Sequence, residues 1–347
     1  MQPATSAQPV GFGVIGAGIV GGAWHAHVYS RLPHARLVAV CDLDAQRAAA
    51  VADACGSAAV YTDYRELLAR PDIAAVSVAT PDFAHREIAV AAAEAGKHIL
   101  VEKPLATTVA DAEAIVAAAR RAGVKLMVDF HNRVNPLFVA AQRSLRAGEI
   151  GRPAYIYARL SNTTYVPTRM LAWAGRSSAL WFLASHTVDL ARWLLEDEPQ
   201  RVYAVSRAGI LQGLGVDAPD FHTAIVEFRG GAVVNLESAW ILPESAPNIF
   251  DFKVEILGST GAIAINGSDH RAIETYTTAG ARLPDLFGMP GGESPRLHGF
   301  VLESIARFVD AVVDDQPLPA TGEDGVRATQ VLAAIAESAA SGQPVTL

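Results

Sequence analysis

The chain has 347 residues, which predicts two domains because one domain commonly spans about 150 residues. Hydrophobic residues make up 51% and charged residues 18%, so the composition excludes intrinsic disorder. Charged residues or proline interrupt every apolar stretch before the roughly 18 residues of a membrane span. The net charge of −8, without any basic block, argues against nucleic acid or a membrane as the main partner.

Two cysteines cannot form a disulfide framework, and residues 1–10 are predicted to be a disordered tail without a secretion signal. We therefore expect a cytoplasmic globular protein.

The first half of the chain alternates short apolar strands with alanine-rich helices. The predicted strands lie at 11–16, 35–42, 74–80, 98–102 and 125–130, and the predicted helices at 20–31, 45–56, 86–96 and 109–123. This alternation predicts βαβ units around a parallel sheet, and strands so continuously apolar suit a sheet that helices cover on both faces. We expect an α/β Rossmann domain over residues 11–130.

The pattern changes in the second half. Residues 151–162, 222–240 and 251–267 predict strands, with tight glycine turns at 230–231 and 258–261. A helix is predicted over 177–195 and another near the C-terminus. We expect an α+β domain with a mostly antiparallel sheet over 131–347, its last helix being a candidate to pack back on the first domain.

The first strand runs into a glycine motif that opens a helix. In this G-x-G-x-x-G pattern, Gly16 permits a tight turn, Gly18 lets the backbone approach a pyrophosphate, and Gly21 lets helix pack on strand. Phosphates then meet unsatisfied N–H groups at the helix N-terminus, around Ile19 and Val20.

Asp42 ends the second strand at the spacing expected of an acid that binds the adenosine ribose. A carboxylate there accepts hydrogen bonds from the 2′-hydroxyl and repels a 2′-phosphate, which favours NAD over NADP. The alternative is that Asp42 only caps the next turn.

Three polar clusters follow further predicted strands. They are Thr80-Pro81-Asp82 with His85, then Glu102-Lys103-Pro104, and then His131-Asn132-Arg133. Because ligands bind at the carboxyl ends of the strands in open α/β sheets, these loops are expected to converge on one cleft. Lysine is rare in the chain, and a partly desolvated ammonium can polarise a hydroxyl or a carbonyl. Lys103 is therefore a candidate acid–base or electrophilic group, the alternative being a surface ion pair with Glu102.

His186 and Asp189 stand three residues apart on the predicted helix 177–195. They could share a face, with the carboxylate orienting the imidazole, although a lone histidine on such a helix is more often structural. Trp173 is interpreted as core or cleft wall. The spacing of His222, His270 and His298 suggests no metal site.

In these residues and their order, the sequence resembles the Gfo/Idh/MocA family, which includes glucose–fructose oxidoreductase and inositol 2-dehydrogenase. The resemblance covers nearly the whole chain and rests on GVIGAGIVG, VAVCD, ATPDFAH, VEKPLA, VDFHNRVNP and LWFLASHTVDLARW. It implies a Rossmann domain followed by an α+β domain with a large open antiparallel sheet that commonly supports homodimers or homotetramers. It also implies hydride transfer between a nicotinamide and a sugar, sugar derivative or cyclitol.

The resemblance assigns roles residue by residue. Lys103 and His186 are the expected catalytic pair, and the peptide before Pro104 is expected to be cis. The expected cofactor-binding residues are Gly16, Gly18, Ile19, Val20, Asp42, Thr80, Pro81, His85, Glu102 and Lys103. The expected substrate-binding residues are Lys103, His131, Arg133, Trp173, Arg176, His186 and Asp189.

One position departs from the family pattern. Many of these dehydrogenases carry an aspartate four residues before the catalytic histidine, where this chain has Phe182. Phenylalanine is expected neither to orient a substrate hydroxyl nor to tune Lys103 electrostatically, so Asp189 or His131 would have to supply orientation.

Two alternatives to a dehydrogenase therefore stay open: a nicotinamide-binding regulator without turnover, and an NAD-dependent glycosidase that recycles its cofactor. The proline- and glycine-rich stretch 284–298 is expected to be either a cover over the cleft or an arm exchanged with a neighbouring subunit.

Overall fold

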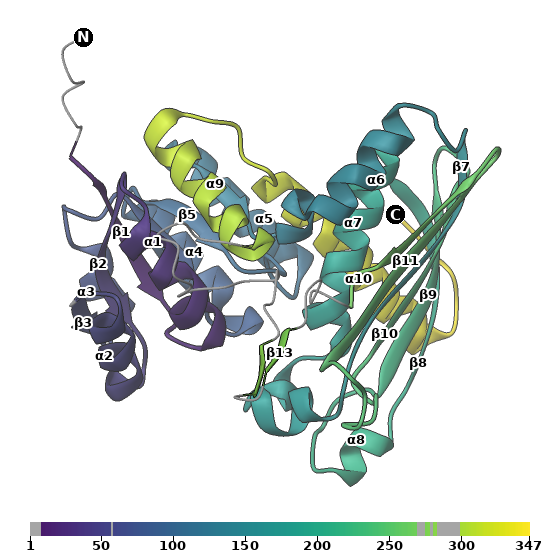
Figure 1. The fold of residues 1–347 in the computed structure, drawn as a ribbon, viewed down its shortest axis with the longest axis horizontal. Helices are drawn as coiled ribbons and strands as arrows, with labels where there is room; N and C mark the ends of the chain where they lie inside the picture. The colour runs from purple at the N-terminus through teal and green to yellow at the C-terminus, as the bar shows by residue number, and fades with distance from the viewer. Residues whose placement is uncertain (1–7, 57, 269–274, 278–279, 283–298) are drawn as a thin grey trace. The chain divides into compact units, whose positions relative to one another are not determined.

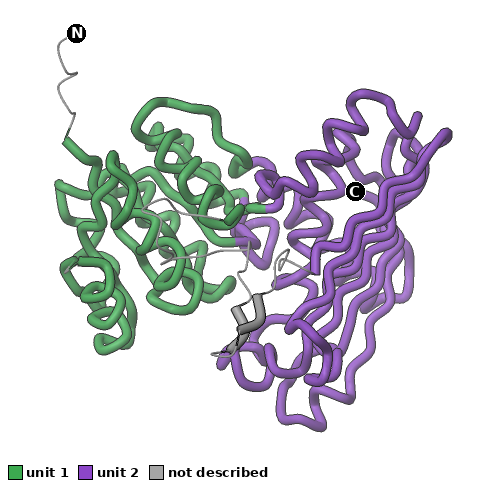
Figure 2. The backbone as a smooth tube through the Cα atoms, in the orientation of Figure 1, with its two compact units in different colours: residues 1–102, 113–131, 284–322 green, residues 103–112, 132–283, 323–347 purple. Residues whose placement is uncertain are grey.

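The structure is a computed structural model that describes residues 8–56, 58–268, 275–277, 280–282 and 299–347. Of the predicted tail over residues 1–10, residues 1–7 lie outside these residues, and Val10 begins the first strand. The stretch 284–298 and the histidines at 270 and 298 also lie outside the described residues. The chain divides into two compact units. The first comprises residues 1–102, 113–131 and 284–322, and the second comprises 103–112, 132–283 and 323–347 (Figure 2).

The first unit is built on a six-stranded parallel sheet. Its strand order is β3-β2-β1-β4-β5-β6. Figure 1 labels four of these strands, β1, β2, β3 and β5. The strands are β1 Val10–Ile15, β2 Ala35–Cys41, β3 Ala59–Tyr61, β4 Ala75–Val78, β5 His98–Val101 and β6 Leu126–Val128. β1 pairs with both β2 and β4, so the order of the strands reverses there. The carboxyl ends of β1 and β4 thus form the crevice in which such sheets bind ligands.

The helices of the first unit connect these strands. They are η1 Gly21–Ala26 with α1 His27–Arg31, α2 Ala45–Ala54, α3 Tyr64–Leu68, η2 Asp82–Ala84, α4 His85–Glu94, α5 Val109–Ala122 and α9 Phe300–Asp314. On one face of the sheet, Phe12 of β1 stacks on Tyr29 of α1, with ring centroids 4.5 Å apart. Phe308 of α9 packs edge-on against the same Phe12 ring at 6.2 Å. A helix from the last quarter of the chain therefore completes the core of the first unit.

The second unit contains a seven-stranded sheet with the order β12-β11-β7-β10-β9-β8-β15. The strands are β7 Pro153–Asn162, β8 Pro199–Arg207, β9 Phe221–Phe228, β10 Val233–Ala239, β11 Phe250–Gly258, β12 Ala262–Asn266 and β15 Val345–Thr346. Only β10 and β7 pair in parallel; every other pairing in this sheet is antiparallel. The glycine turns at 230–231 and 258–261 join β9 to β10 and β11 to β12, as predicted. A separate ribbon pairs β13 Thr275–Thr277 with β14 Gly280–Arg282.

Helices cover one face of this second sheet. They include α6 Pro136–Arg146, α7 Ser185–Leu195 and α10 Gly322–Ser341. Shorter helical segments elsewhere in the chain are η3 His131–Val134, η4 Val166–Met170, η5 Ala174–Arg176, η6 Leu180–Ala184 and α8 Ile210–Gly213. Val188 of α7 and Val331 of α10 line the same apolar space as Val226 and Val234 of the sheet. The opposite face presents Tyr203, Ile225 and Leu257, which are 44%, 48% and 48% exposed. This alternation of buried and exposed positions is the period-2 pattern of a sheet covered on one side.

The predicted fold class is confirmed: a Rossmann sheet is followed by a mixed, mostly antiparallel sheet with helices. Within the described residues, no helix is long and apolar enough to cross a membrane.

Candidate active site

Glycine closes the turn after β1 against the end of β4. Gly16 has φ +98°, and a Cβ atom there would lie 2.4 Å from the carbonyl oxygen of Ala79. A Cβ on Gly21 would lie 1.8 Å from the carbonyl oxygen of Gly16, whereas one on Gly18 would meet nothing within 4 Å. The first and third glycines therefore serve packing, and Gly18 leaves open space against the backbone. Ile19, which is 53% exposed, and Val20 lead from this turn into η1.

The carboxylate of Asp42 ties the end of β2 to the glycine turn. Its Oδ2 accepts a hydrogen bond from the backbone N–H of Ala17 at 2.8 Å, and its Oδ1 accepts one from Asp44 at 2.9 Å. Arg47 Nη1 lies 3.5 Å from Oδ1. Asp42 thus makes both the local turn contact of the alternative interpretation and a contact with the glycine turn.

The loop after β4 lies next to this turn. His85 begins α4 fully inside the unit, and its Nε2 lies 2.9 Å from the carbonyl oxygen of Thr80. The Thr80 hydroxyl oxygen is buried without a hydrogen-bond partner among the described residues. Pro81 precedes η2 in extended conformation. A buried hydroxyl costs free energy unless it is paired, so Thr80 suits contact with a polar group of a bound cofactor.

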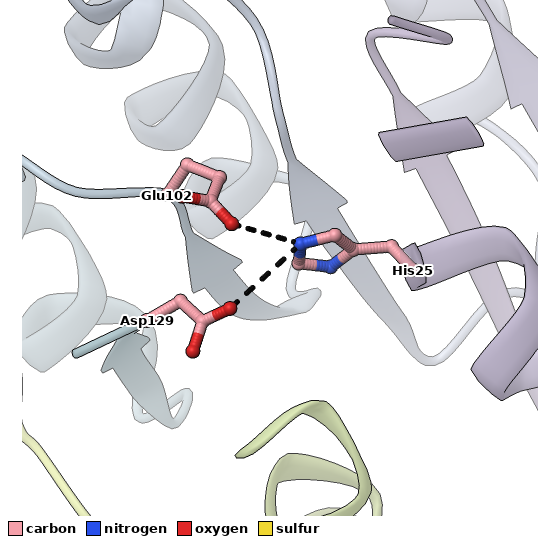
Figure 3. A group of neighbouring side chains, drawn as sticks. All are labelled: His25, Glu102 and Asp129. Carbon is pink, nitrogen blue, oxygen red and sulfur yellow. Dashed lines mark hydrogen bonds and ion pairs between the residues drawn. The ribbon is translucent and has the colours of Figure 1, made fainter. Parts of the chain in front are cut away.

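A cluster that the sequence analysis missed lies at the ends of β5 and β6 (Figure 3). His25 Nε2 is 3.0 Å from Glu102 Oε1 and 3.9 Å from Asp129 Oδ2, and all three side chains are buried. On the other side of the imidazole, Nδ1 lies 2.8 Å from the hydroxyl oxygen of Ser77. The Glu102 carboxylate, expected to contact the cofactor, is therefore engaged by a histidine inside the first unit.

Two hydroxyl groups extend the His25 cluster. The Tyr29 hydroxyl lies 2.5 Å from Ser77 Oγ, and Ser304 of α9 donates to Asp129 Oδ1 at 2.5 Å. Burial is the main cause that raises the pKa of Tyr29 above its usual value, so this tyrosine stays neutral.

The ligand atoms of His25, Glu102 and Asp129 lie within 4.8 Å of one another, and histidine and carboxylates are residue types that hold metal ions. However, the 3.0 Å contact between Nε2 and Oε1 is the distance of a direct hydrogen bond. We therefore interpret the cluster as a hydrogen-bonded charge network.

In the second unit, Lys103 is held against Phe182. Its Nζ donates a hydrogen bond to the carbonyl oxygen of Phe182 at 3.0 Å, and the same ammonium lies 4.3 Å from the centroid of the Phe182 ring. The Lys103–Pro104 peptide is cis, as the resemblance implied. The expectation that Phe182 has no electrostatic part in positioning Lys103 did not foresee this contact, because the negative face of an aromatic ring attracts a cation at this distance.

Two tryptophans flank Phe182. The ring centroids of Trp173 and Trp240 each lie 6.0 Å from that of Phe182. Trp240 is fully buried, whereas Trp173 is half-buried. Arg176, in the short segment after Trp173, is exposed.

His186 lies on α7, four residues after Phe182, which is about one helical turn. It is 8% exposed. Phe182 and His186 thus belong to one continuous helical segment, and Lys103 is attached to its first turn.

Asp189, three residues after His186, is bound by an arginine. Arg133 Nη2 donates to Asp189 Oδ1 at 2.6 Å and Nε donates to Oδ2 at 2.9 Å, while Nη2 also lies 3.0 Å from Asp324. Burial favours a neutral guanidine, but the two carboxylates outweigh it and raise the pKa of Arg133 above its usual value. The charge partner of Asp189 is therefore Arg133, and both are fixed inside the second unit.

The predicted site residues fall into two groups. The first unit holds the glycine turn, Asp42, Thr80, Pro81, His85, Glu102 and His131, whose ring lies 5.6 Å from that of Phe300. The second unit holds Lys103, Arg133, Trp173, Arg176, His186 and Asp189. Within the first unit, Asp42 contacts the glycine turn. Within the second unit, Arg133 binds Asp189.

Comparison with known proteins places this architecture in a family. Residues 10–130 match the model of an oxidoreductase family with an NAD-binding Rossmann fold, and residues 138–264 match the GFO/IDH/MocA C-terminal domain. The chain therefore belongs to the Gfo/Idh/MocA oxidoreductases, and its first unit is their NAD-binding domain.

The relatives match over nearly their whole length. The chain is 31% identical over 342 residues to a 1,5-anhydro-D-fructose reductase of Ensifer adhaerens, covering 96% of this chain and 97% of that protein. It is 30% identical over 336 residues to inositol 2-dehydrogenase 2 of Saccharopolyspora erythraea, covering 95% and 93%. The crystal structure of GenD2 from gentamicin A biosynthesis, in complex with NAD, is 28% identical with a TM-score of 0.84, covering 99% and 98%.

Proposed function

We propose that the protein transfers hydride between NAD and a carbon that bears a hydroxyl group on a sugar, a sugar derivative or a cyclitol. The observation that carries this proposal is the attachment of Lys103 to the helical segment of His186, through the carbonyl oxygen of Phe182. This contact attaches the Lys103 ammonium to the helical segment that carries the His186 imidazole. Oxidation of an alcohol needs both a donor to the reacting oxygen and an acceptor for its proton.

Each residue has a distinct task in this proposal. In the oxidative direction, the Lys103 ammonium donates a hydrogen bond to the reacting oxygen, and His186 accepts the hydroxyl proton. Bound NAD supplies the acceptor for the hydride. Gly18, Asp42 and Thr80 hold it, and the carboxylate of Asp42 favours NAD over NADP because it would repel a 2′-phosphate.

Two observations support a polyol substrate. The relatives named above include a reductase of an anhydro sugar and an inositol dehydrogenase. The half-buried Trp173 is a candidate aromatic surface for the C–H face of a ring, and Asp189 on the helix of His186 is bound by Arg133. The relatives are named as redox enzymes, which favours neither a regulator without turnover nor a glycosidase.

The test is the absorbance of reduced nicotinamide, with purified protein, NAD or NADP, and a panel of inositols, sugars, anhydro sugars and sugar acids. We expect NAD-linked turnover that falls by at least about a thousandfold in Lys103→Ala and about a hundredfold or more in His186→Asn. The affinity for NAD, followed by fluorescence quenching, should stay within a few-fold. Undiminished turnover in Lys103→Ala would contradict the proposal.

We also propose that the protein is a cytoplasmic homodimer or homotetramer. The exposed sheet positions Tyr203, Ile225 and Leu257 give it an apolar surface that suits a second copy. Cys41 and Cys55 are free thiols, as is usual in a reducing compartment. Sedimentation equilibrium would show a single monomeric mass if the oligomer were absent.

A further inference from the structure

We propose that Phe182 is a positioning residue for Lys103, which holds the ammonium by a cation–π contact where related enzymes use a carboxylate. This inference rests on the proposed function only for the role of Lys103 in turnover. The contact itself can be tested without any substrate.

The contact has two parts from one residue. The ring of Phe182 lies 4.3 Å from Lys103 Nζ, and the carbonyl of Phe182 accepts a hydrogen bond from the same nitrogen at 3.0 Å. The hydrogen bond fixes the direction of one N–H, and the ring face attracts the positive charge without taking another N–H. Lysine has a flexible stem that loses much conformational freedom when it is ordered, so two contacts are needed to hold it.

The ring is itself held in place. Trp173 meets Phe182 nearly edge-on, at an interplanar angle of 67°, and Trp240 meets it at 57°. Trp240 is fully buried. Because aromatic side chains packed on two sides keep their rotamers, the ring presents a fixed surface to the ammonium.

The chemistry of this arrangement differs from that of a carboxylate partner. A carboxylate would accept a proton-sharing hydrogen bond and would compete with the substrate for the N–H donors of Lys103. A ring stabilises the positive charge and accepts no conventional hydrogen bond. The Phe182 ring therefore attracts and positions the ammonium without itself accepting a conventional N–H hydrogen bond.

The first experiment replaces Phe182 by phenylalanines carrying one, two and three ring fluorines, which weaken the negative face of the ring without changing its shape. We expect kcat to fall with each fluorine, by about tenfold for three, with NAD affinity unchanged. The same series at Phe138 is the matched control, because its ring packs on Phe252 at 5.2 Å and serves the core. A flat series at position 182, or equal losses at both positions, would overturn the proposal.

Two ordinary variants separate the ring from the bulk of the side chain. Phe182→Leu keeps an apolar side chain of similar volume and should lose about as much kcat as the trifluoro ring, while Phe182→Tyr should keep most of it. If leucine matched tyrosine, the ring would have only a packing role.

The second experiment needs no turnover. The chain has four lysines, Lys97, Lys103, Lys125 and Lys253, so carbon-13-labelled lysine gives spectra that single Lys→Arg variants assign. The signal of the Lys103 side chain next to Nζ should be shifted upfield by the Phe182 ring current and should lose this shift in Phe182→Leu. An unchanged signal would overturn the proposal. A retained shift in a protein that reduces no NAD with any polyol would instead contradict the proposed function and leave the contact standing.

Discussion

Each unit holds two carboxylates around one nitrogen-bearing side chain, which is a histidine in the first unit and an arginine in the second. In the first unit, Glu102 and Asp129 share His25, which offers one nitrogen to both. In the second, Asp189 and Asp324 share Arg133, whose planar guanidinium offers several donors at once. Arginine stays charged at every accessible pH, whereas histidine does not. The cation of the second cluster therefore keeps its charge across the accessible pH range, and it binds Asp189 on α7, the helix that also carries His186.

The largest effect should come from removing the arginine. Arg133→Met leaves the buried Asp189 carboxylate without its hydrogen-bonded counter-charge, while Arg192 stays 3.8 Å from the partly exposed Asp324, so the free energy of unfolding should fall by about 3–5 kcal/mol. Urea denaturation measures it, with Arg143→Met on the exposed side of α6 as the control, for which a change within about 0.5 kcal/mol is expected. A loss below about 1 kcal/mol in Arg133→Met would show that the cluster is not held by charge.

His222 is a buried histidine outside both clusters, and it shows how burial alone changes stability with pH. His222 lies on β9 opposite Ser238, and among the described residues its Nδ1 has no hydrogen-bond partner. Burial lowers its pKa from 6.5 to about 4. The unfolded chain therefore binds a proton more readily, so stability is complete above pH 6.5 and is lost as the pH falls towards 4.

At pH 4 this loss should reach about 3 kcal/mol, because each unit of pKa difference corresponds to about 1.4 kcal/mol. His222→Gln should remove that part of the acid dependence when unfolding is measured between pH 7 and 4. An identical pH dependence in the variant would contradict the assignment.

Removing His25 should lower the free energy of unfolding less than removing Arg133 does. A second substitution that removes a neighbouring carboxylate charge should restore part of the loss. His25→Asn is expected to lower the free energy of unfolding by about 2–3 kcal/mol, because Glu102 and Asp129 lose the imidazole nitrogen that lies 3.0 Å and 3.9 Å from their oxygens. Adding Glu102→Gln removes one of the two charges and should recover at least about half of the loss. If the double variant were less stable than His25→Asn, repulsion between the carboxylates would not be the cause.

An exposed ion pair, Arg70 with Asp72, should contribute least to the free energy of unfolding. Arg70 donates to both oxygens of Asp72 at 2.8 Å and thereby lowers the pKa of Asp72 to about 2, but the two side chains are 30% and 36% exposed. Asp72→Asn should cost less than about 1 kcal/mol near neutral pH, since solvent screens the pair. Its contribution is present above the ordinary carboxyl range and is lost as the pH falls towards 2. A cost equal to that of Arg133→Met would remove the distinction between buried and exposed pairs.

The sequence predicted the two sheets because their strands carry a local signal. The apolar runs of β1, β2, β4, β5 and β6 are continuous, and the glycine turns mark two of the hairpins. β3 was not predicted, since its three residues are only partly buried. The packing of α9 on Phe12 had no signal either, because a contact between residues 12 and 308 leaves no periodic trace near either one.

The site residues also divide into those that a local sequence pattern predicted and those that it did not. Asp42 and Lys103 were found because each stands directly after a strand, within a recognisable pattern. His25 was missed because its partners come from the ends of two other strands, 77 residues away in the case of Glu102. The partner of Asp189 was also missed: helical spacing pointed to His186, but Arg133 lies 56 residues away and binds both oxygens of the carboxylate. Only folding brings such residues together.

The most direct test of the account is whether hydride leaves a ring carbon and enters the nicotinamide. The wild-type protein would be incubated with NAD and ring-deuterated substrates from the active part of the panel, and the nicotinamide would be analysed by mass spectrometry. The account predicts one deuterium in the reduced nicotinamide of the wild-type protein and none in that of Lys103→Ala over the same time. Reduced nicotinamide without deuterium, or no reduction with any ring-deuterated polyol although NAD binds, would contradict it.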